Sequence, residues 1–143
     1  MKVILTLLFV LQATLGIQAQ SENPEHLINK LNNDQLYGTC HYVWVLEMES
    51  AAADMLIEIG KPVTDKLIPL LDSPDKGIIA HIVLSHIWIK DFTSTSSFKN
   101  FETKGIVEYS YNGLLFYEKD GKIIAEKDKL TENKKIWTKK LKK

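Results

Sequence analysis

Four histidines are the residues of this chain best suited to acid–base chemistry, and two of them, His81 and His86, lie in one apolar segment. They are five residues apart, about 140° around a helix, so they cannot bind one metal ion from a single face. Neither a His-x-x-x-His nor a Cys-x-x-Cys spacing occurs in the sequence. We therefore expect no metal site and no cofactor.

His81 and Ser85 lie one helical turn apart and share a face of the predicted helix. A histidine base beside a hydroxyl is a pair that can activate a nucleophile. The sequence marks neither an orienting acid nor an oxyanion hole for such a pair. We favour a hydrogen-bonded pair inside a seam between helices and assign no catalytic residue. The alternative is a small exported hydrolase using His81 and Ser85, which a pocket open around His81 would favour.

Cys40 is the single cysteine of the chain, so no intramolecular disulfide can form. His41 follows it directly, but a reacting pair must meet in space, and neighbours along the chain rarely do so. We therefore predict a buried, unreactive thiol.

Acidic side chains recur along a second predicted helix, from about His41 to Ile59, whose apolar residues return at three- and four-residue steps. Its polar face carries Glu47, Asp54 and Glu58. We predict that these three acids bind a cationic partner. The alternative is a solvated face, partly neutralised by Lys61 or by the lysine-rich C-terminal segment.

The basic composition argues against nucleic acid as the main partner. The chain has 18 basic and 18 acidic residues, and every basic residue is lysine. The planar guanidinium group of arginine, which suits bidentate recognition of phosphate, is therefore missing. We expect another protein, rather than nucleic acid, as the partner.

Residues 1–19 have the three parts of a cleavable signal peptide. Lys2 gives a positive start, Val3–Leu11 is almost wholly apolar, and the small residue Ala19 precedes a polar stretch. The apolar run is shorter than the roughly 20 residues that a membrane-spanning helix requires. An N-terminal anchor or a buried helix is the alternative. We predict export, to a periplasm or out of the cell, and a single mature domain over residues 20–143.

The mature chain divides into a helical half, residues 24–90, and a strand half, residues 105–126, which predicts the α+β class. The predicted helices of the first half are Pro24–Leu36, His41–Ile59, Pro62–Leu71 and Asp75–Lys90. A connector rich in Ser and Thr, residues 91–104, leads to a three-stranded meander packed on the helices. Asn112-Gly113 and Asp120-Gly121 favour its two hairpin turns. A basic helix is predicted at 131–143, docked or frayed rather than lying on a membrane.

Two stretches of the helical half are similar to each other: Ala52–Ile59 and Ala80–Ile87 align at an offset of 28 residues. Between them lie Ile59-Gly60-Lys61-Pro62-Val63 and the turn Asp72-Ser73-Pro74-Asp75. Residues 51–89 thus resemble a short HEAT-type helical repeat, and an ordinary helical subdomain with a similar turn is the alternative. The resemblance implies an interaction scaffold without chemistry of its own. Small size, export and the lack of catalytic motifs favour a non-enzymatic protein-binding domain, for example a periplasmic immunity-type protein that neutralises an incoming toxin.

Overall fold

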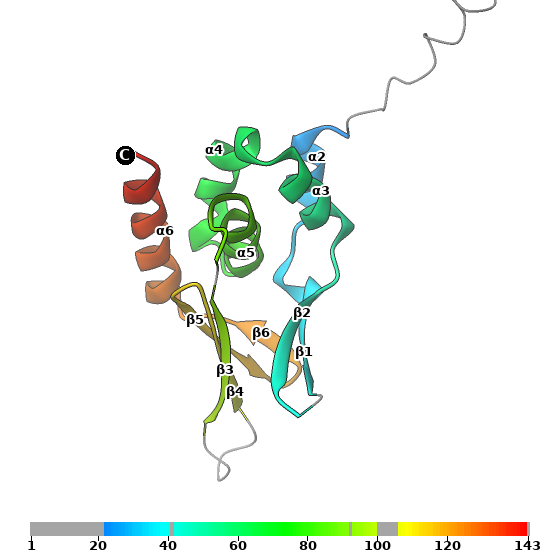
Figure 1. Cartoon of the computed structure of the whole chain (residues 1–143), viewed down its shortest axis with the longest axis vertical. Helices are drawn as coiled ribbons and strands as arrows, with labels where there is room; N and C mark the ends of the chain where they lie inside the picture. The colour runs from blue at the N-terminus through cyan, green and yellow to red at the C-terminus, as the bar shows by residue number, and fades with distance from the viewer. Residues whose placement is uncertain (1–21, 41, 92, 100–105, 143) are drawn as a thin grey trace, which may run out of the picture.

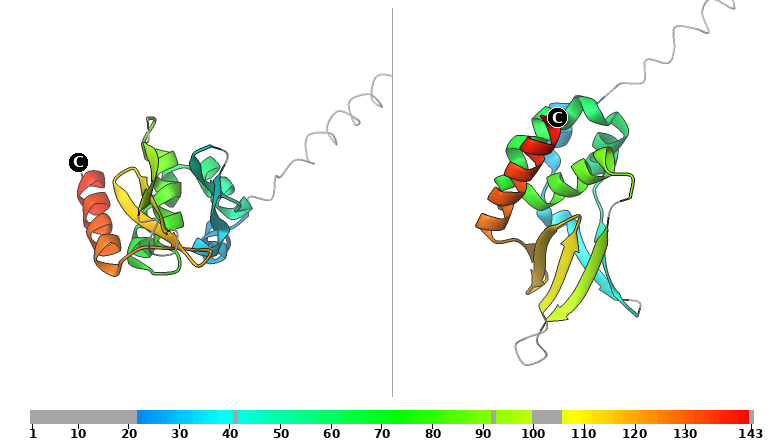
Figure 2. Two further views of the ribbon diagram at one scale, coloured as in Figure 1. Left: turned by 90° about the horizontal axis from the view of Figure 1, so that it is seen from below. Right: turned by 60° about the vertical axis from the view of Figure 1, so that its left-hand side comes forward.

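The computed structural model describes residues 22–40, 42–91, 93–99 and 106–142, so the predicted signal peptide lies outside the described residues. The helices gather at one end of the molecule and the strands at the other (Figures 1 and 2). The strands form a two-stranded antiparallel sheet, β1-β2, and a four-stranded antiparallel sheet, β3-β4-β5-β6. The predicted α+β class is confirmed.

In chain order, and with η marking 3-10 helices, the elements are α2 (Pro24–Lys30), η1 (Asn33–Gln35), β1 (Leu36–Cys40), β2 (Trp44–Met48), α3 (Ala51–Ile59), η2 (Lys61–Val63), α4 (Thr64–Leu67), η3 (Ile68–Asp72), α5 (Gly77–Trp88), β3 (Ser94–Lys99), β4 (Ile106–Tyr111), β5 (Leu114–Lys119), β6 (Lys122–Ile124) and α6 (Lys127–Leu141).

The segment between α2 and α3 is a β-hairpin, so the prediction of a helix from His41 to Ile59 is wrong in its first half. Strands β1 and β2 pair antiparallel, with Tyr37 opposite Glu47. The side chains of β2 alternate between half-buried and exposed, which is the period of a strand. The helix starts only at α3, where the Ser50 side chain accepts a hydrogen bond from the backbone N–H of Ala53 at 3.2 Å.

The first predicted helix, Pro24–Leu36, is also too long, because α2 ends at Lys30. Asn32 and Gln35 then cap the short helix η1 reciprocally, and Leu36 already belongs to β1. The third predicted helix, Pro62–Leu71, is divided into η2, α4 and η3. Pro69, which has no backbone N–H to donate, lies within η3. The similarity of residues 51–89 to HEAT-type repeats stays a prediction.

Both predicted hairpin turns of the strand half are confirmed. Tyr111 pairs with Leu114 around Asn112-Gly113, and Lys119 pairs with Lys122 around Asp120-Gly121. All four turn residues have positive φ, as a type I′ turn requires. The buried face of these strands contains Val107, Tyr109, Tyr111, Leu114, Phe116 and Ile123.

The predicted connector contributes a fourth strand to this sheet. Residues Ser94–Lys99 form β3 and pair with β4 over its whole length. The prediction of a three-stranded meander therefore missed one strand of this sheet. Since this segment is made mainly of Ser and Thr, it lacks the apolar alternation that marks a half-buried strand.

Helix α5 lies at the centre of the helical end, and every residue from Gly77 to Ser85 is buried. Its N-terminus is capped from outside its own segment. The Asn33 Oδ1 accepts a hydrogen bond from the backbone N–H of Ile79 at 3.0 Å, and its Nδ2 donates to the Pro74 carbonyl at 2.7 Å. Asn33 thus fixes the start of the central helix relative to η1.

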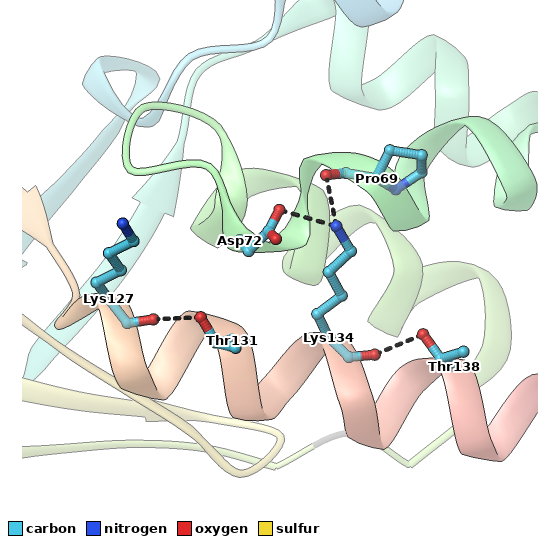
Figure 3. Close-up of polar contacts among 6 residues, drawn as sticks. All are labelled: Pro69, Asp72, Lys127, Thr131, Lys134 and Thr138. Carbon is cyan, nitrogen blue, oxygen red and sulfur yellow. Dashed lines mark hydrogen bonds and ion pairs between the residues drawn. The ribbon is translucent and has the colours of Figure 1, made fainter.

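Helix α6 begins at Lys127, before the predicted start at residue 131. Thr131 does not cap it, because the Thr131 hydroxyl donates to the Lys127 carbonyl one turn earlier inside the helix (Figure 3). The helix docks on η3 and β5. The Lys134 ammonium donates to the Asp72 carboxylate at 3.0 Å and to the Pro69 carbonyl at 3.2 Å (Figure 3). The docked form of the predicted C-terminal helix is therefore the one observed.

Candidate functional site

His81 lies in α5 and is almost wholly buried, and both of its ring nitrogens have partners other than Ser85. The Nε2 atom is 2.7 Å from the Tyr111 carbonyl oxygen of β4, and the indole N–H of Trp137 in α6 donates to Nδ1 at 2.9 Å. The Ser85 hydroxyl donates instead to the His81 backbone carbonyl at 2.8 Å. The base–nucleophile pair that the hydrolase hypothesis requires is thus not formed.

These partners fix the charge state of His81. A carbonyl oxygen beside Nε2 requires an N–H there, and an indole N–H facing Nδ1 requires a lone pair there, so the ring is a neutral imidazole. Burial lowers the pKa of His81 to about 4, and the hydrogen bond to the Tyr111 carbonyl opposes this only in part. His81 therefore joins three elements and is not available as a base near neutral pH.

A cavity of about 280 Å³ lies beside His81, between α6 and the β4–β5 turn. Its walls are formed by His81, Asn112, Gly113, Leu114, Leu115, Lys129, Glu132, Asn133, Ile136, Trp137 and Lys140. Ser85 does not belong to this lining and is wholly buried. The cavity consequently does not supply the nucleophile that an acyl-transfer site would need.

The three predicted partner-binding acids do not form one helical stripe. Glu47 lies on β2, whereas Asp54 and Glu58 lie on α3, one turn apart. All three side chains are exposed. The acids are therefore available to a partner, but the single helix expected to carry them is a hairpin followed by a shorter helix.

The exposed face of α3 combines acidic and apolar side chains. Asp54 and Glu58 alternate along it with Met55 and Ile59, which are 38% and 37% exposed. The preceding hairpin adds four more exposed apolar side chains, Tyr37, Tyr42, Val43 and Val45. We call the exposed residues Asp54, Met55, Glu58 and Ile59 the α3 face.

Cys40 is exposed, so the prediction of a buried thiol is wrong. The residue ends β1 at the turn end of the hairpin, where it pairs with Trp44. Cys40 falls between the predicted helices Pro24–Leu36 and His41–Ile59, in a segment that the structure forms into a hairpin.

Within residues 22–40, 42–91, 93–99 and 106–142, no three His, Cys, Asp or Glu side chains are grouped closely enough to hold a metal ion. In the same residues, no helix has both the length and the apolar character needed to cross a bilayer.

The cavity residues on α6 were missed by the sequence prediction. Lys129, Asn133, Trp137 and Lys140 recur at three- and four-residue steps, and this spacing is the signal that would have grouped them on one face. It was hidden because the helix was predicted to start after Lys129.

In comparisons of the chain with protein-family models, with curated proteins and with solved structures, none of the three gives a match.

Proposed function

We propose that the mature chain is an exported, non-enzymatic domain that binds another protein through the α3 face, with Glu47 on the adjoining hairpin. The observation that carries the proposal is the alternation of Asp54 and Glu58 with the exposed apolar residues Met55 and Ile59. Protein interfaces combine apolar anchors with polar groups at their rim. Since both charged residues are acidic, the partner surface is cationic with apolar contacts.

The solvated-face alternative expects Lys61 or the lysine-rich C-terminal segment to neutralise part of this acidic charge. The Lys61 ammonium lies 4.6 Å from the centre of the Trp88 ring. Helix α6, with the lysine-rich segment, lies on the far side of α5 from α3 (Figures 1 and 2). The C-terminal lysines therefore do not cover this acidic face, which supports a role in binding.

The hydrolase alternative has no comparable support, because the His81 ring and the Ser85 hydroxyl are hydrogen-bonded to other groups.

The proposal of export rests on residues 1–19, and N-terminal sequencing of the secreted or periplasmic form tests it. Cleavage after Ala19 would leave Gln20 as the first residue, whereas retention of the leader would contradict export through a cleaved signal.

The binding proposal is tested by affinity capture of the tagged mature protein from its native cell envelope, with identification of the retained proteins by mass spectrometry. The informative variant changes Glu47→Gln, Asp54→Asn and Glu58→Gln together. The matched control changes three other exposed acids, Asp120→Asn, Glu126→Gln and Asp128→Asn.

We expect one stoichiometric partner with the wild type and the control, and its loss with the first variant. Substitutions of exposed side chains change stability by only about 0.5 kcal/mol, so both variants should stay folded. Equal retention by both variants would rule out the acids as the binding determinant. An immunity-type role adds one further requirement: the wild type and control, but not the first variant, must protect cells from the captured toxin.

A further inference from the structure

The cavity beside His81 contains a polar group that the fold leaves unpaired. Asn133 in α6 is only 6% exposed and lines the cavity, and its Nδ2 atom is buried without a hydrogen-bond partner among the described residues. An unpaired buried donor costs about 1–3 kcal/mol. A ligand whose hydrogen-bond acceptor reaches this donor, with a small rotation of the Asn133 side chain, would remove this penalty.

Charged groups on the same helix also line the cavity. Lys129 and Lys140 contribute two ammonium groups to the cavity lining, against the single carboxylate of Glu132. The lining therefore carries one excess positive charge. Together with the Asn133 amide, it favours a ligand that accepts hydrogen bonds and carries a negative charge.

The remaining wall is apolar, with two buried and two exposed residues. Leu114 and Trp137 are 3% and 2% exposed, and Ile136 and Leu115 complete this side. The Trp137 ring is held in place by its hydrogen bond to His81. This wall suits an aromatic ring or a short aliphatic chain.

We propose that the cavity binds a small monocarboxylate with an apolar body. Its volume, about 280 Å³, is at the lower limit of ligand pockets, so the body is one ring or a short chain. The carboxylate accepts from Asn133 Nδ2 and lies near Lys129 and Lys140, and the apolar body contacts Leu114 and Trp137. This site lies on α6 and is separate from the α3 face.

The experiment is a titration of the mature protein followed by ¹H–¹⁵N NMR, with benzoate and hexanoate as probes. Benzyl alcohol and benzylamine serve as the neutral and cationic counterparts of benzoate. The reporting signals are the side-chain amide of Asn133 and the indole N–H of Trp137. We expect saturable shifts of both signals with a carboxylate, tighter binding of benzoate than of benzyl alcohol, and the weakest binding with benzylamine.

Two variants locate the site. Asn133→Leu should weaken carboxylate binding about tenfold, because it removes a hydrogen bond to a charged group, while a dispersed spectrum reports that the fold is kept. Lys140→Gln, at an exposed position that does not endanger folding, should also weaken it. Lys139→Gln, next along the helix and outside the cavity lining, should leave binding unchanged. No saturable shift with either carboxylate, equal affinity for the three benzene derivatives, or equal effects of Lys139→Gln and Lys140→Gln would overturn the proposal.

Discussion

His81 is held as a neutral imidazole because its neighbours on β4 and α6 need it in that form. The carbonyl of Tyr111 accepts from one nitrogen, and the indole of Trp137 donates to the other. A proton on Nδ1 would face the indole N–H and break that bond. The ring therefore stabilises the packing of three elements only while it is uncharged.

The first prediction is that acid destabilises the fold through His81. Its pKa is lowered from 6.5 to about 4, so the unfolded chain binds a proton that the folded chain excludes. The contribution of neutral His81 to the free energy of unfolding is fully present above pH 6.5. It falls as the pH decreases toward 4, by on the order of 3 kcal/mol. Urea denaturation at pH 7 and at pH 4 measures the loss, and an NMR titration of the ring measures the pKa directly.

Two variants separate His81 from other titrating groups. His81→Gln keeps a donor and an acceptor but does not titrate, so its stability should vary less between pH 7 and pH 4. His26→Gln, at an exposed site, should keep the wild-type dependence. If the His81 ring titrated near pH 6.5, or if the pH dependence of stability were unchanged in His81→Gln, the account of His81 as a buried, neutral ring would be contradicted.

The sequence predicted part of the residue-scale picture. It placed His81 and Ser85 on one helical face, because that follows from their spacing. It could not show that the ring bonds to Tyr111 and Trp137, which lie 30 and 56 residues further along the chain. Nor could it foresee an exposed Cys40, since exposure depends on whether the surrounding segment is a hairpin or a helix.

At the scale of elements, local signals were reliable where they fixed the backbone directly. Asn112-Gly113 and Asp120-Gly121 predicted their turns, because both turns require positive φ, and the register of the strands follows from these turns. The β1–β2 hairpin was missed because its apolar residues fit helical and strand spacing alike. The cap of α5 could not be predicted from its own segment, since Asn33 supplies it from η1.

The second prediction concerns this cap. Asn33→Ala removes the acceptor of the Ile79 N–H and the donor to the Pro74 carbonyl, both at the buried start of α5. We expect a loss of about 1–3 kcal/mol in the free energy of unfolding, measured by chemical denaturation. Asn29→Ala, at an exposed position nearby, should change it by less than about 0.5 kcal/mol. Similar losses in the two variants would contradict a specific capping role.

At the scale of the whole molecule, one contact between the two sheets is made by β1, at Gly38. The Tyr109 hydroxyl donates to the Glu118 carboxylate at 3.2 Å, and this pair lies directly against the backbone of Gly38. A Cβ at Gly38 would overlap both side chains. Burial, with the neighbouring Glu118 carboxylate, raises the pKa of Tyr109 above its usual value. Glycine therefore sets how closely the hairpin approaches the sheet.

The third prediction follows from this contact. Gly38→Ala should destabilise the protein by about 1–3 kcal/mol, because the added methyl group displaces the Tyr109–Glu118 pair. Removing the hydroxyl with Tyr109→Phe makes room, so Gly38→Ala should cost less in that background. Additive losses in the double variant, measured by urea denaturation, would show that the two residues are not in contact.

The central claim is that the α3 face contacts a protein partner, and site-specific photocrosslinking tests it most directly. A photoreactive residue replaces Met55 in the full chain, expressed in its native cells, and a control places it at Lys135 on α6. We predict one crosslinked product of defined mass from position 55, lost when Asp54→Asn and Glu58→Gln are added, and none from position 135. The same products from both positions, or no product from position 55, would contradict the claim.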